Sequence, residues 1–539
     1  MIFLSLFSLR TSHHCQMLRN KIESRIFGSQ QKRSFPKKLN QLKQMKRRTF
    51  LEIANLSSVG LLLFPSLSCT SEITDETKRI PLKVENPGKS ELPEGKRVPF
   101  GWPAAGINPG ESIQLKLEEK LPENDCWLRI SIAQEIREEK LLHVRIPDTE
   151  TYLGAIDIRF SSVLVPYELE IKKEHTSKIN KHGLELTLEA PTQLWIFDTK
   201  AEKANNQAFL PHLLTADRTT GAIEDFLDCF LSVSSVQAFG WREGTVLDGL
   251  WQIHDKKGNE LALEAIQQHF DLFFDDQQNL VYEDGHSRPK LNQIDGIEST
   301  IPFATLARLD SDHPILKEVV AGWQRLEKEN GAVIDGHSYT AEGCYTVAYP
   351  MAVLGKAWNN LELMENALAQ LKHRFVLFND GILYLRYHGN GNYTYPNWAR
   401  GAAWTLLGFA RTMAELKDVR QDEELISKFR EGIELAISMQ GEDGLWHCFM
   451  HRPEVLPDTG GSAGIAAAIL VGIENGFLAE SYKMHALQCW EGLQAYISPD
   501  GFLRGVAQDN RAGEKLQESD YRVIAQMGMG LMAHLYAHL

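Results

Sequence analysis

The feature that most constrains the fold is an internal repeat in the second half of the chain. Segments in which Asp-Gly precedes apolar and aromatic residues begin at Asp380, Asp443 and Asp500, about 60 residues apart. One such segment follows each of several pairs of candidate helices, so the repeating unit is a helical hairpin. A repeat of this kind forms either an open solenoid or a closed ring.

Helical periodicity extends from Ile223 to Leu539. The apolar spacing predicts helices over 223–239, 243–255, 260–274, 297–309, 314–328, 342–358, 361–377, 401–416, 421–439, 460–475, 479–497 and 520–538. These form six hairpins, which is the number that closes into an (α/α)6 barrel. We therefore expect a closed barrel over 223–539, with the starts of the inner helices meeting at a central crevice.

Residues 97–215 have a different pattern. Apolar and polar residues alternate in runs such as 126–132 and 184–188, and turn residues separate the runs. This pattern is typical of antiparallel strands and predicts a β-sandwich-like module. The expected fold is thus multidomain, with the β-rich module before the barrel. We expect a structural role for the module, with a carbohydrate-binding appendage as the alternative.

The N-terminal region resembles an export signal. Residues 45–69 combine a basic start, Arg47-Arg48, a short apolar run and small residues before Cys69, as in twin-arginine or lipoprotein signals. Residues 1–44 are then an upstream extension, and the polar stretch 70–96 is a linker. We expect a periplasmic or outer-membrane-anchored protein with a lipid at Cys69. The alternative is an uncleaved apolar helix.

Charge limits the partners of the folded part. Residues 1–68 hold 12 of the 57 Lys and Arg and two of the 71 Asp and Glu, so the remainder is strongly acidic. Nucleic acid and anionic membranes require basic surface and are not expected as partners. An anionic sugar would need a local cationic pocket. The seven cysteines are scattered without metal-ligand spacing, and no metal or cofactor is expected.

Carboxylates recur where the predicted inner helices begin. Asp295, Glu342 and Asp458 occupy such positions in successive hairpins. Each of them alone could be an ordinary helix cap. Sugar hydrolysis needs one carboxyl as proton donor and a second group to activate water or attack carbon. Asp295 and Glu342, on adjacent inner helices, are the predicted catalytic pair.

Aromatic residues and an arginine accompany these acids. Trp398, Arg400 and Trp404 lie at the start of one predicted helix, where an indole can stack on a sugar and a guanidinium can bind a carboxylate. The alternative is that both indoles belong to the core and Arg400 pairs with a structural Asp. The further substrate-binding candidates are His337, Tyr345, His388, Asp458 and Arg522.

Residues 240–539 resemble the unsaturated uronyl hydrolases of glycoside hydrolase families 88 and 105. The similar segments are Trp-Ala-Arg-Gly-Ala-Ala-Trp at 398–404, Asp-Thr-Gly-Gly-Ser-Ala at 458–463, Ala-Glu-Gly-Cys-Tyr at 341–345 with Pro350, and Gln-Ile-Asp at 293–295. The resemblance implies an (α/α)6 barrel and exo-action on a terminal uronic acid. It also implies that Glu342 is the general acid/base, that Asp295 supports it, and that Arg400 and Trp398 hold the sugar.

Three departures separate the chain from those families. Glu342 replaces an aspartate, Ala402 and Ala403 replace an Asn-Gly pair, and the β-rich module is additional. These features are similar to the β-glucuronidases of family 154. Two mechanisms therefore remain: hydration of a 4,5-unsaturated uronate by one acid/base, or cleavage of a saturated glycoside by two carboxyls.

The leading hypothesis is an exported exo-glycosidase that removes a terminal uronic acid from plant or algal oligosaccharides. A polysaccharide lyase is one alternative, with His337, His388 and Tyr345 as its bases. A non-catalytic sugar-binding lipoprotein is the other, because the replacement of aspartate by Glu342 could mark a lost activity.

Overall fold

The computed structural model describes residues 79–86, 90–198, 207–215 and 221–539. The expectations for 1–44, 45–69 and Cys69 lie outside these residues and stay predictions. Within the described ranges, no helix has both the length and the apolar character that a membrane span requires. The five cysteines of this part of the chain are buried and unpaired, as their scattered positions predict.

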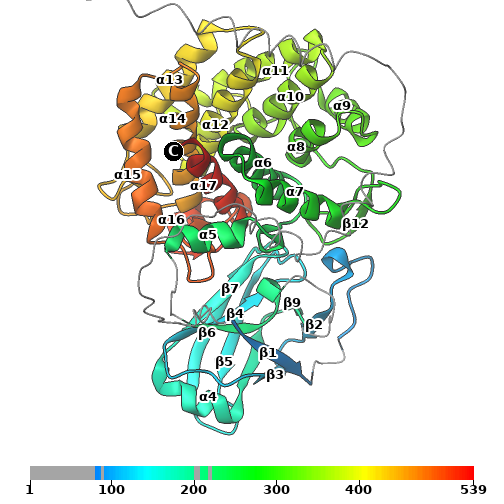
Figure 1. Cartoon of the computed structure of the whole chain (residues 1–539), viewed down its shortest axis with the longest axis vertical. Coiled ribbons are helices and arrows are strands. Elements are labelled where there is room, and N and C mark those ends of the chain that lie inside the picture. The colour runs from blue at the N-terminus through cyan, green and yellow to red at the C-terminus, as the bar shows by residue number, and fades with distance from the viewer. Residues whose placement is uncertain (1–78, 87–89, 199–206, 216–220) are drawn as a thin grey trace, which may run out of the picture. The chain divides into compact units, whose positions relative to one another are not determined.

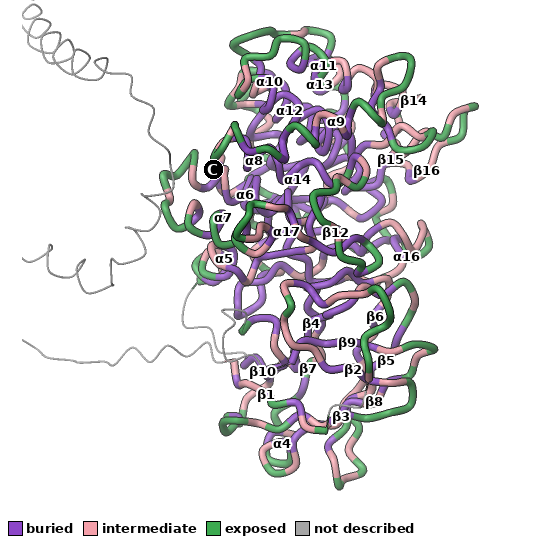
Figure 2. Tube along the Cα trace, turned by 90° about the vertical axis from the view of Figure 1, so that its right-hand side faces the viewer, coloured by how far each residue is buried: buried purple, intermediate pink, exposed green. Residues whose placement is uncertain are grey.

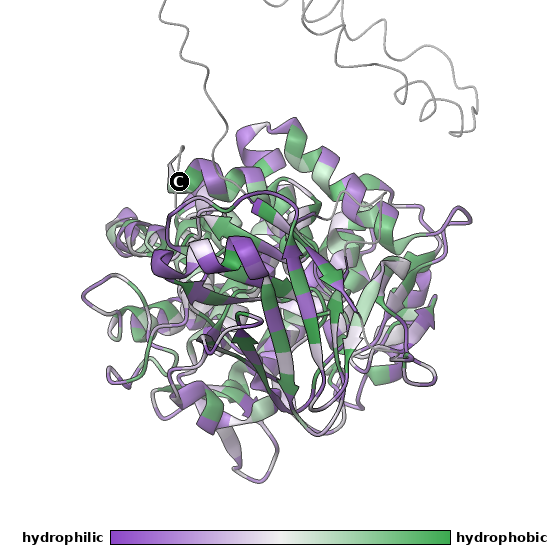
Figure 3. Ribbon diagram, turned by 90° about the horizontal axis from the view of Figure 1, so that it is seen from below, coloured by the Kyte–Doolittle hydropathy of each residue, from purple (hydrophilic) through white to green (hydrophobic). Residues whose placement is uncertain are grey.

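The first part of the described chain is built from antiparallel strands. They are β1 (Arg79–Glu85), β2 (Ala104–Ile107), β3 (Ser112–Leu117), β4 (Cys126–Ser131), β5 (Glu139–Arg145), β6 (Tyr152–Arg159), β7 (Pro166–Ile171), β8 (Leu184–Glu189), β9 (Leu194–Phe197) and β10 (His212–Thr215). Eight of them form one sheet in the order β6-β5-β8-β3-β1-β10-β4-β7, and β2 pairs with β9. Hydrophilic and hydrophobic residues alternate along these strands, as Figure 3 shows.

Strand β1 corrects the expected linker over 70–96. Its first three residues pair with β10 and its last four with β3, so it joins the two halves of the sheet. Ile80, Leu82 and Val84 are buried, at the period-two spacing of a strand. The stretch contains prolines and charged residues, and the strand buries only three side chains. Its sequence pattern therefore did not predict a strand.

Twelve α-helices form the barrel, one in each predicted interval. The inner helices are α6 (Trp241–Lys257), α8 (Pro302–Leu309), α10 (Tyr349–Ala357), α12 (Ala399–Leu416), α14 (Thr459–Glu474) and α17 (Gln526–His538). The outer helices are α5 (Ala222–Phe230), α7 (Glu260–Phe273), α9 (Ile315–Leu326), α11 (Leu361–His373), α13 (Glu423–Ile437) and α15 (Lys483–Gln494). Each inner helix packs on the next, and α17 packs on α6, so the ring is closed (Figure 1).

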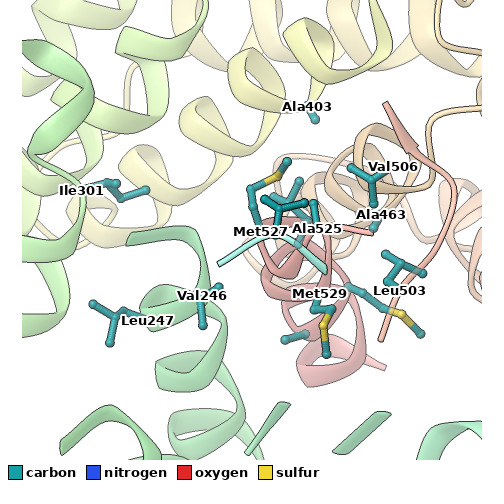
Figure 4. Packing of buried hydrophobic residues seen from close by; sticks show 14 of the residues in the cluster. Val246, Leu247, Ile301, Ala403, Ala463, Leu503, Val506, Ala525, Met527 and Met529 are labelled. Carbon is teal, nitrogen blue, oxygen red and sulfur yellow. The ribbon is translucent and has the colours of Figure 1, made fainter. Parts of the chain in front are cut away.

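The two helix layers differ in sequence because they differ in burial. Residues from Thr459 to Gly472 of α14 are all buried, and α17 is similarly enclosed (Figure 2). Outer helices have one apolar face, and α7, α11 and α13 begin at side-chain caps: Asn259, Asn360 and Asp422. Figure 4 shows Met527 of α17 in the apolar core that Ala403 of α12 and Ala463 of α14 also enter.

The repeated Asp-Gly segments have a common backbone geometry. Gly381, Gly444 and Gly501 all have positive φ angles, between 74° and 87°. At Gly501 a Cβ atom would lie 2.0 Å from the carbonyl oxygen of Asp225. The repeated glycine therefore marks a left-handed turn in each of these hairpins, a conformation that glycine adopts without strain.

Two predicted helices begin differently from expectation. The 342–358 interval contains a π-helical segment, Cys344–Ala348, before α10. Pro350 has no N–H for the carbonyl of Thr346, and the Thr300 hydroxyl donates to that carbonyl instead. The last helix begins at Gln526 rather than at 520, because Arg522–Val523 forms strand β18 with β17 (Val506–Ala507).

Buried ion pairs join the β module to the barrel. Arg129 of β4 is fully buried, and its guanidinium donates to Glu168 at 2.8 Å and to Asp500 at 3.4 Å. Burial favours the neutral acid, yet the guanidiniums of Arg129 and Arg79 hold the pKa of Asp500 well below its ordinary value. The module is thus fixed to the turn that carries the third Asp-Gly segment.

Candidate active site

A cavity of 410 Å³ lies where several inner helices begin. Its barrel walls come from the start of α6, the segment before α8, the segment before α10, strand β15 (Ile382–Tyr387) and α12. Loop residues 509–511 and residues 135–137 and 162–163 of the β module complete it. The module therefore contributes one wall of this pocket, which the sequence did not indicate.

Six of the predicted site residues line this pocket together. They are Asp295, Glu342, Tyr345, Trp398, Arg400 and Trp404. The other four, His337, His388, Asp458 and Arg522, are not among its lining residues. The closed ring thus gathers acids and indoles from separate hairpins, as its topology predicts.

Glu342 is a nearly buried carboxyl with free bonding capacity. Its side chain opens the helical segment before α10 and is 6% exposed. Oε1 accepts from Nδ2 of Asn510 at 3.3 Å and lies 3.7 Å from an Nη atom of Arg386. Oε2 has no hydrogen-bond partner among the described residues. A buried carboxylate oxygen without a donor is costly, and a substrate proton or hydroxyl would satisfy it.

Glu298 is the acid that sequence reasoning missed. It lies in the short 3-10 helix Ile297–Ser299 and projects into the pocket. Glu298 is exposed to the pocket solvent, yet desolvation by the protein atoms around it and then the negative charge of Glu342 raise its pKa to about 7. This carboxyl therefore loses its proton at a higher pH than an ordinary glutamate. Its position three residues after Asp295, on the same turn, was the available signal.

Asp295 lies in the same pocket and is likewise exposed. Its charge acts on Asp335, whose pKa is raised by burial and further by Asp295 and Glu342. Asp335 in turn accepts from the backbone N–H of Ile297 at 3.2 Å. The predicted pair of Asp295 and Glu342 is thus part of a larger group of acids that includes Glu298 and Asp335.

Arg400 follows the alternative that the sequence left open. Its guanidinium is buried, pairs through Nε with Asp458 at 3.2 Å, and donates to the carbonyls of Ala507 and Gln508. Asp458 is fully buried and caps α14 by accepting from the N–H of Gly460. Arg400 and Asp458 therefore hold the 507–508 segment in place, and Asp458 does not face the pocket.

Three other predicted binding residues lie away from the cavity. Arg522 donates to four backbone carbonyls, those of Leu456, Pro457, Ser519 and Tyr521. His388 is exposed on the hairpin of β15 and β16 (Tyr393–Pro396), with Nδ1 2.8 Å from the Ser338 hydroxyl. His337 is exposed on the preceding loop. Their closeness to motif residues in sequence did not bring them into the pocket.

The aromatic residues form the inner end of the pocket. Tyr345 stacks on Trp404 with ring centroids 5.9 Å apart, and Trp241 meets Trp404 edge-on. The Tyr345 hydroxyl donates to the buried carboxylate of Asp248 at 2.6 Å, so it points away from the cavity. Trp398 lies beneath the guanidinium of Arg400, 5.1 Å from its ring. The indoles of Trp398 and Trp404 thus belong to the core, at 2% and 4% exposure, and only a small part of each reaches the cavity surface.

The cationic side of the pocket comes from residues that no motif marked. Arg242 is paired with Asp509, and Arg511 is paired with both Asp509 and Glu135. Arg386 of β15 has a looser contact, the 3.7 Å approach to Glu342. Arg386 is therefore the pocket cation best able to bind a substrate carboxylate. These arginines converge only in three dimensions, so no spacing along the sequence could identify them.

Across the described residues, no group of three or more His, Cys, Asp or Glu side chains could hold a metal ion. The pocket carboxyls are instead surrounded by arginines, asparagine and one another. The arrangement can donate a proton, bind a carboxylate and stack a ring.

Comparisons with solved structures agree with this architecture. A protein from Salmonella enterica, described as a possible member of the GH105 family, superposes with a TM-score of 0.50 at 18% identity, covering 59% of this chain and 92% of that one. A family 105 glycoside hydrolase of C. acetobutylicum gives a TM-score of 0.50 at 18% identity, covering 59% and 98%. At this identity the likeness shows the fold, an (α/α)6 barrel.

Sequence comparisons give a curated relative and a family. The unsaturated rhamnogalacturonyl hydrolase YesR of Bacillus subtilis is 23% identical over 190 residues, which are 34% of this chain and 54% of that protein. The chain thus spans about half the length of this relative. The profile of Glycosyl Hydrolase Family 88 matches residues 216–539. That match covers more than half of the sequence and confirms the resemblance to family 88, so the chain belongs to glycosyl hydrolase family 88.

Proposed function

We propose that this protein is an exo-acting glycoside hydrolase that removes a terminal uronic acid from acidic plant or algal oligosaccharides. The observation that carries the proposal is the presence of Glu342, Glu298 and Arg386 in the lining of one pocket, with Arg386 3.7 Å from Glu342. Family membership and the name of the YesR relative support it. Export, with a lipid at Cys69 and a periplasmic or outer-membrane location, is part of the same proposal.

The substrate is a 4,5-unsaturated uronate at the non-reducing end. Its carboxylate binds the guanidinium of Arg386, which supplies the charge-assisted hydrogen bonds that such a group favours. The ring lies against the indoles of Trp398 and Trp404, whose side chains line the same cavity. A deep, partly closed pocket accepts a chain end more readily than a chain middle, which accounts for exo-action.

Glu342 transfers the proton at the sugar. It gives a proton to C4 of the enol ether and then accepts one from the water that adds at C5, and the resulting hemiketal opens to release the remaining sugar chain. Glu298 shares the proton chemistry, because two neighbouring carboxyls are not both ionised until the pH exceeds the raised pKa of about 7. The pair thus keeps a proton available near neutral pH.

A direct assay tests this proposal. Protein lacking residues 1–69 is incubated with lyase-generated unsaturated disaccharides and, separately, with p-nitrophenyl β-glucuronide. We expect the ultraviolet absorbance of the conjugated enol ether to disappear. Turnover of the glucuronide alone would favour the family 154 type of reaction, and turnover of neither by folded protein would remove the proposal. A rise in that absorbance with polymeric substrate would identify a lyase.

A further inference from the structure

The β module contains a second cavity beside the active-site pocket. It has a volume of 620 Å³, and its lining includes Lys96, Gln134, Arg137, Gln193 and His286. We call it the β-module groove. The barrel contributes only His286 to it, so the groove belongs to the part of the chain that precedes the family match.

The groove and the active-site pocket share a wall. Glu135 and Arg137 line both cavities. Arg137 donates from Nε to the carbonyl of Gly285 at 3.1 Å and lies 3.3 Å from Glu135, so its guanidinium bridges the module and the loop of the barrel. Gly285 lines the pocket and the next residue, His286, lines the groove. A ligand that extends out of the pocket over Arg137 therefore reaches the groove.

The charged residues that line the groove carry more positive than negative charge. Lys140 is buried, and its ammonium group donates to the carboxylate of Glu138 at 2.5 Å and to the carbonyl and hydroxyl of Thr192. Partial desolvation and the charge of Arg137 lower the pKa of His286, which disfavours its charged form. Lys96 is half-buried, and its charge acts on Glu138 across the groove. The lining holds three cations, Lys96, Arg137 and Lys140, against two carboxylates, Glu135 and Glu138, so the cavity has a small positive excess that favours an anionic ligand.

A buried amide adds an independent indication of a ligand. Gln134 is 5% exposed and lines the groove, yet its Nε2 has no acceptor in the described part of the structure. Nearby, Nε2 of Gln193 donates to Asn108 at 2.8 Å, which holds a second amide at the groove. An unpaired buried donor is destabilising, and a sugar hydroxyl would satisfy it.

We propose that the β-module groove binds the leaving-group side of the oligosaccharide, with Lys96 contacting an anionic substituent and Gln134 donating to a hydroxyl. The proposal rests on the proposed function, since it assigns the sugars beyond the one removed. The module then acts in substrate selection, in favour of chains longer than a disaccharide that carry a carboxylate or sulfate on a sugar beyond the scissile bond.

Kinetics on substrates of two lengths test the groove. Unsaturated disaccharides and tetrasaccharides from lyase digests of rhamnogalacturonan and of chondroitin sulfate distinguish carboxylate from sulfate as the recognised anion. For Lys96→Ala and Gln134→Leu, the ratio of kcat/KM for tetrasaccharide to that for disaccharide should fall about tenfold, the effect of one hydrogen bond to a charged group. Lys120→Ala, an exposed lysine of the same module outside the groove, is the matched control and should leave the ratio unchanged.

Binding separates failure of the groove from failure of the proposed function. Calorimetric titration of the same tetrasaccharides into Glu342→Gln protein requires no turnover. Loss of affinity in the Lys96→Ala double variant, but not in the Lys120→Ala one, would support the groove even if the wild type hydrolysed nothing. An unchanged length ratio in an active enzyme, or equal affinities in both double variants, would overturn the groove.

Discussion

At the scale of single residues, the pocket depends on the charge states of two glutamates. The Glu342→Gln variant has no carboxyl group to transfer the proton. Its kcat should be lower by about 10²–10⁴-fold, with a smaller change in KM, because general acid–base catalysis contributes that much. The assay is steady-state turnover of an unsaturated disaccharide, with circular dichroism as the control for folding. Wild-type kcat in this variant would show that another group transfers the proton.

Glu298 should set the upper limb of the pH profile. Its pKa of about 7 means that the protonated form is lost as pH rises through 7, so kcat/KM should fall above that pH. Glu298→Gln keeps a neutral side chain at every pH and should remove this limb. A pH profile unchanged by the substitution would contradict this role.

Sequence information was most useful for the acids and least useful for the cations. Glu342 and Asp295 could be found because inner-helix starts repeat at a regular spacing. Arg386 and Arg242 could not, because a strand and a helix from different hairpins place them in the pocket. Arg400 lines the pocket as expected, but its guanidinium is already paired with Asp458, a partner that the sequence could only offer as an alternative.

At the scale of elements, the ion pair of Arg400 and Asp458 connects α12, α14 and strand β17. Asp458→Ala leaves a buried guanidinium without its partner and should lower the free energy of unfolding by about 3–5 kcal/mol. Denaturant titration measures this loss.

Arg386→Ala, which removes a half-exposed arginine, should leave stability nearly unchanged while raising KM. Equal stability losses in the two variants would contradict the distinction between structural and substrate-binding arginines.

Helix positions could be predicted because burial on all sides or on one face leaves a clear apolar period. Helix starts were less predictable. The π-helical segment before α10 results from Pro350 together with a hydroxyl from Thr300, which lies 46 residues earlier. Strand β18 replaced the first turn of the last predicted helix because a partner, β17, lies close in space. Contacts distant in sequence override local preference at both places.

At the scale of the whole molecule, buried charge holds the β module on the barrel. Asp500→Asn should destabilise the protein by about 3–5 kcal/mol at pH 7, because Arg129 and Arg79 lose their carboxylate. The depressed pKa means that this stabilisation is fully present above the unfolded value of 3.8, declines below it, and is lost as pH falls through the much lower pKa of the folded state. Thermal melts of both proteins should therefore differ at pH 7 and converge in acid. A constant difference across that range would exclude the carboxylate as the cause.

The closed ring imposes an order on biosynthesis. Helix α6 packs on α17, although more than 250 residues of chain separate their first residues. Until the ribosome has released α17, the faces of α6 and α14 that it covers have no neighbour. A chain shortened before α17 should thus aggregate or be degraded rather than retain a fraction of its activity, because those apolar faces would stay exposed.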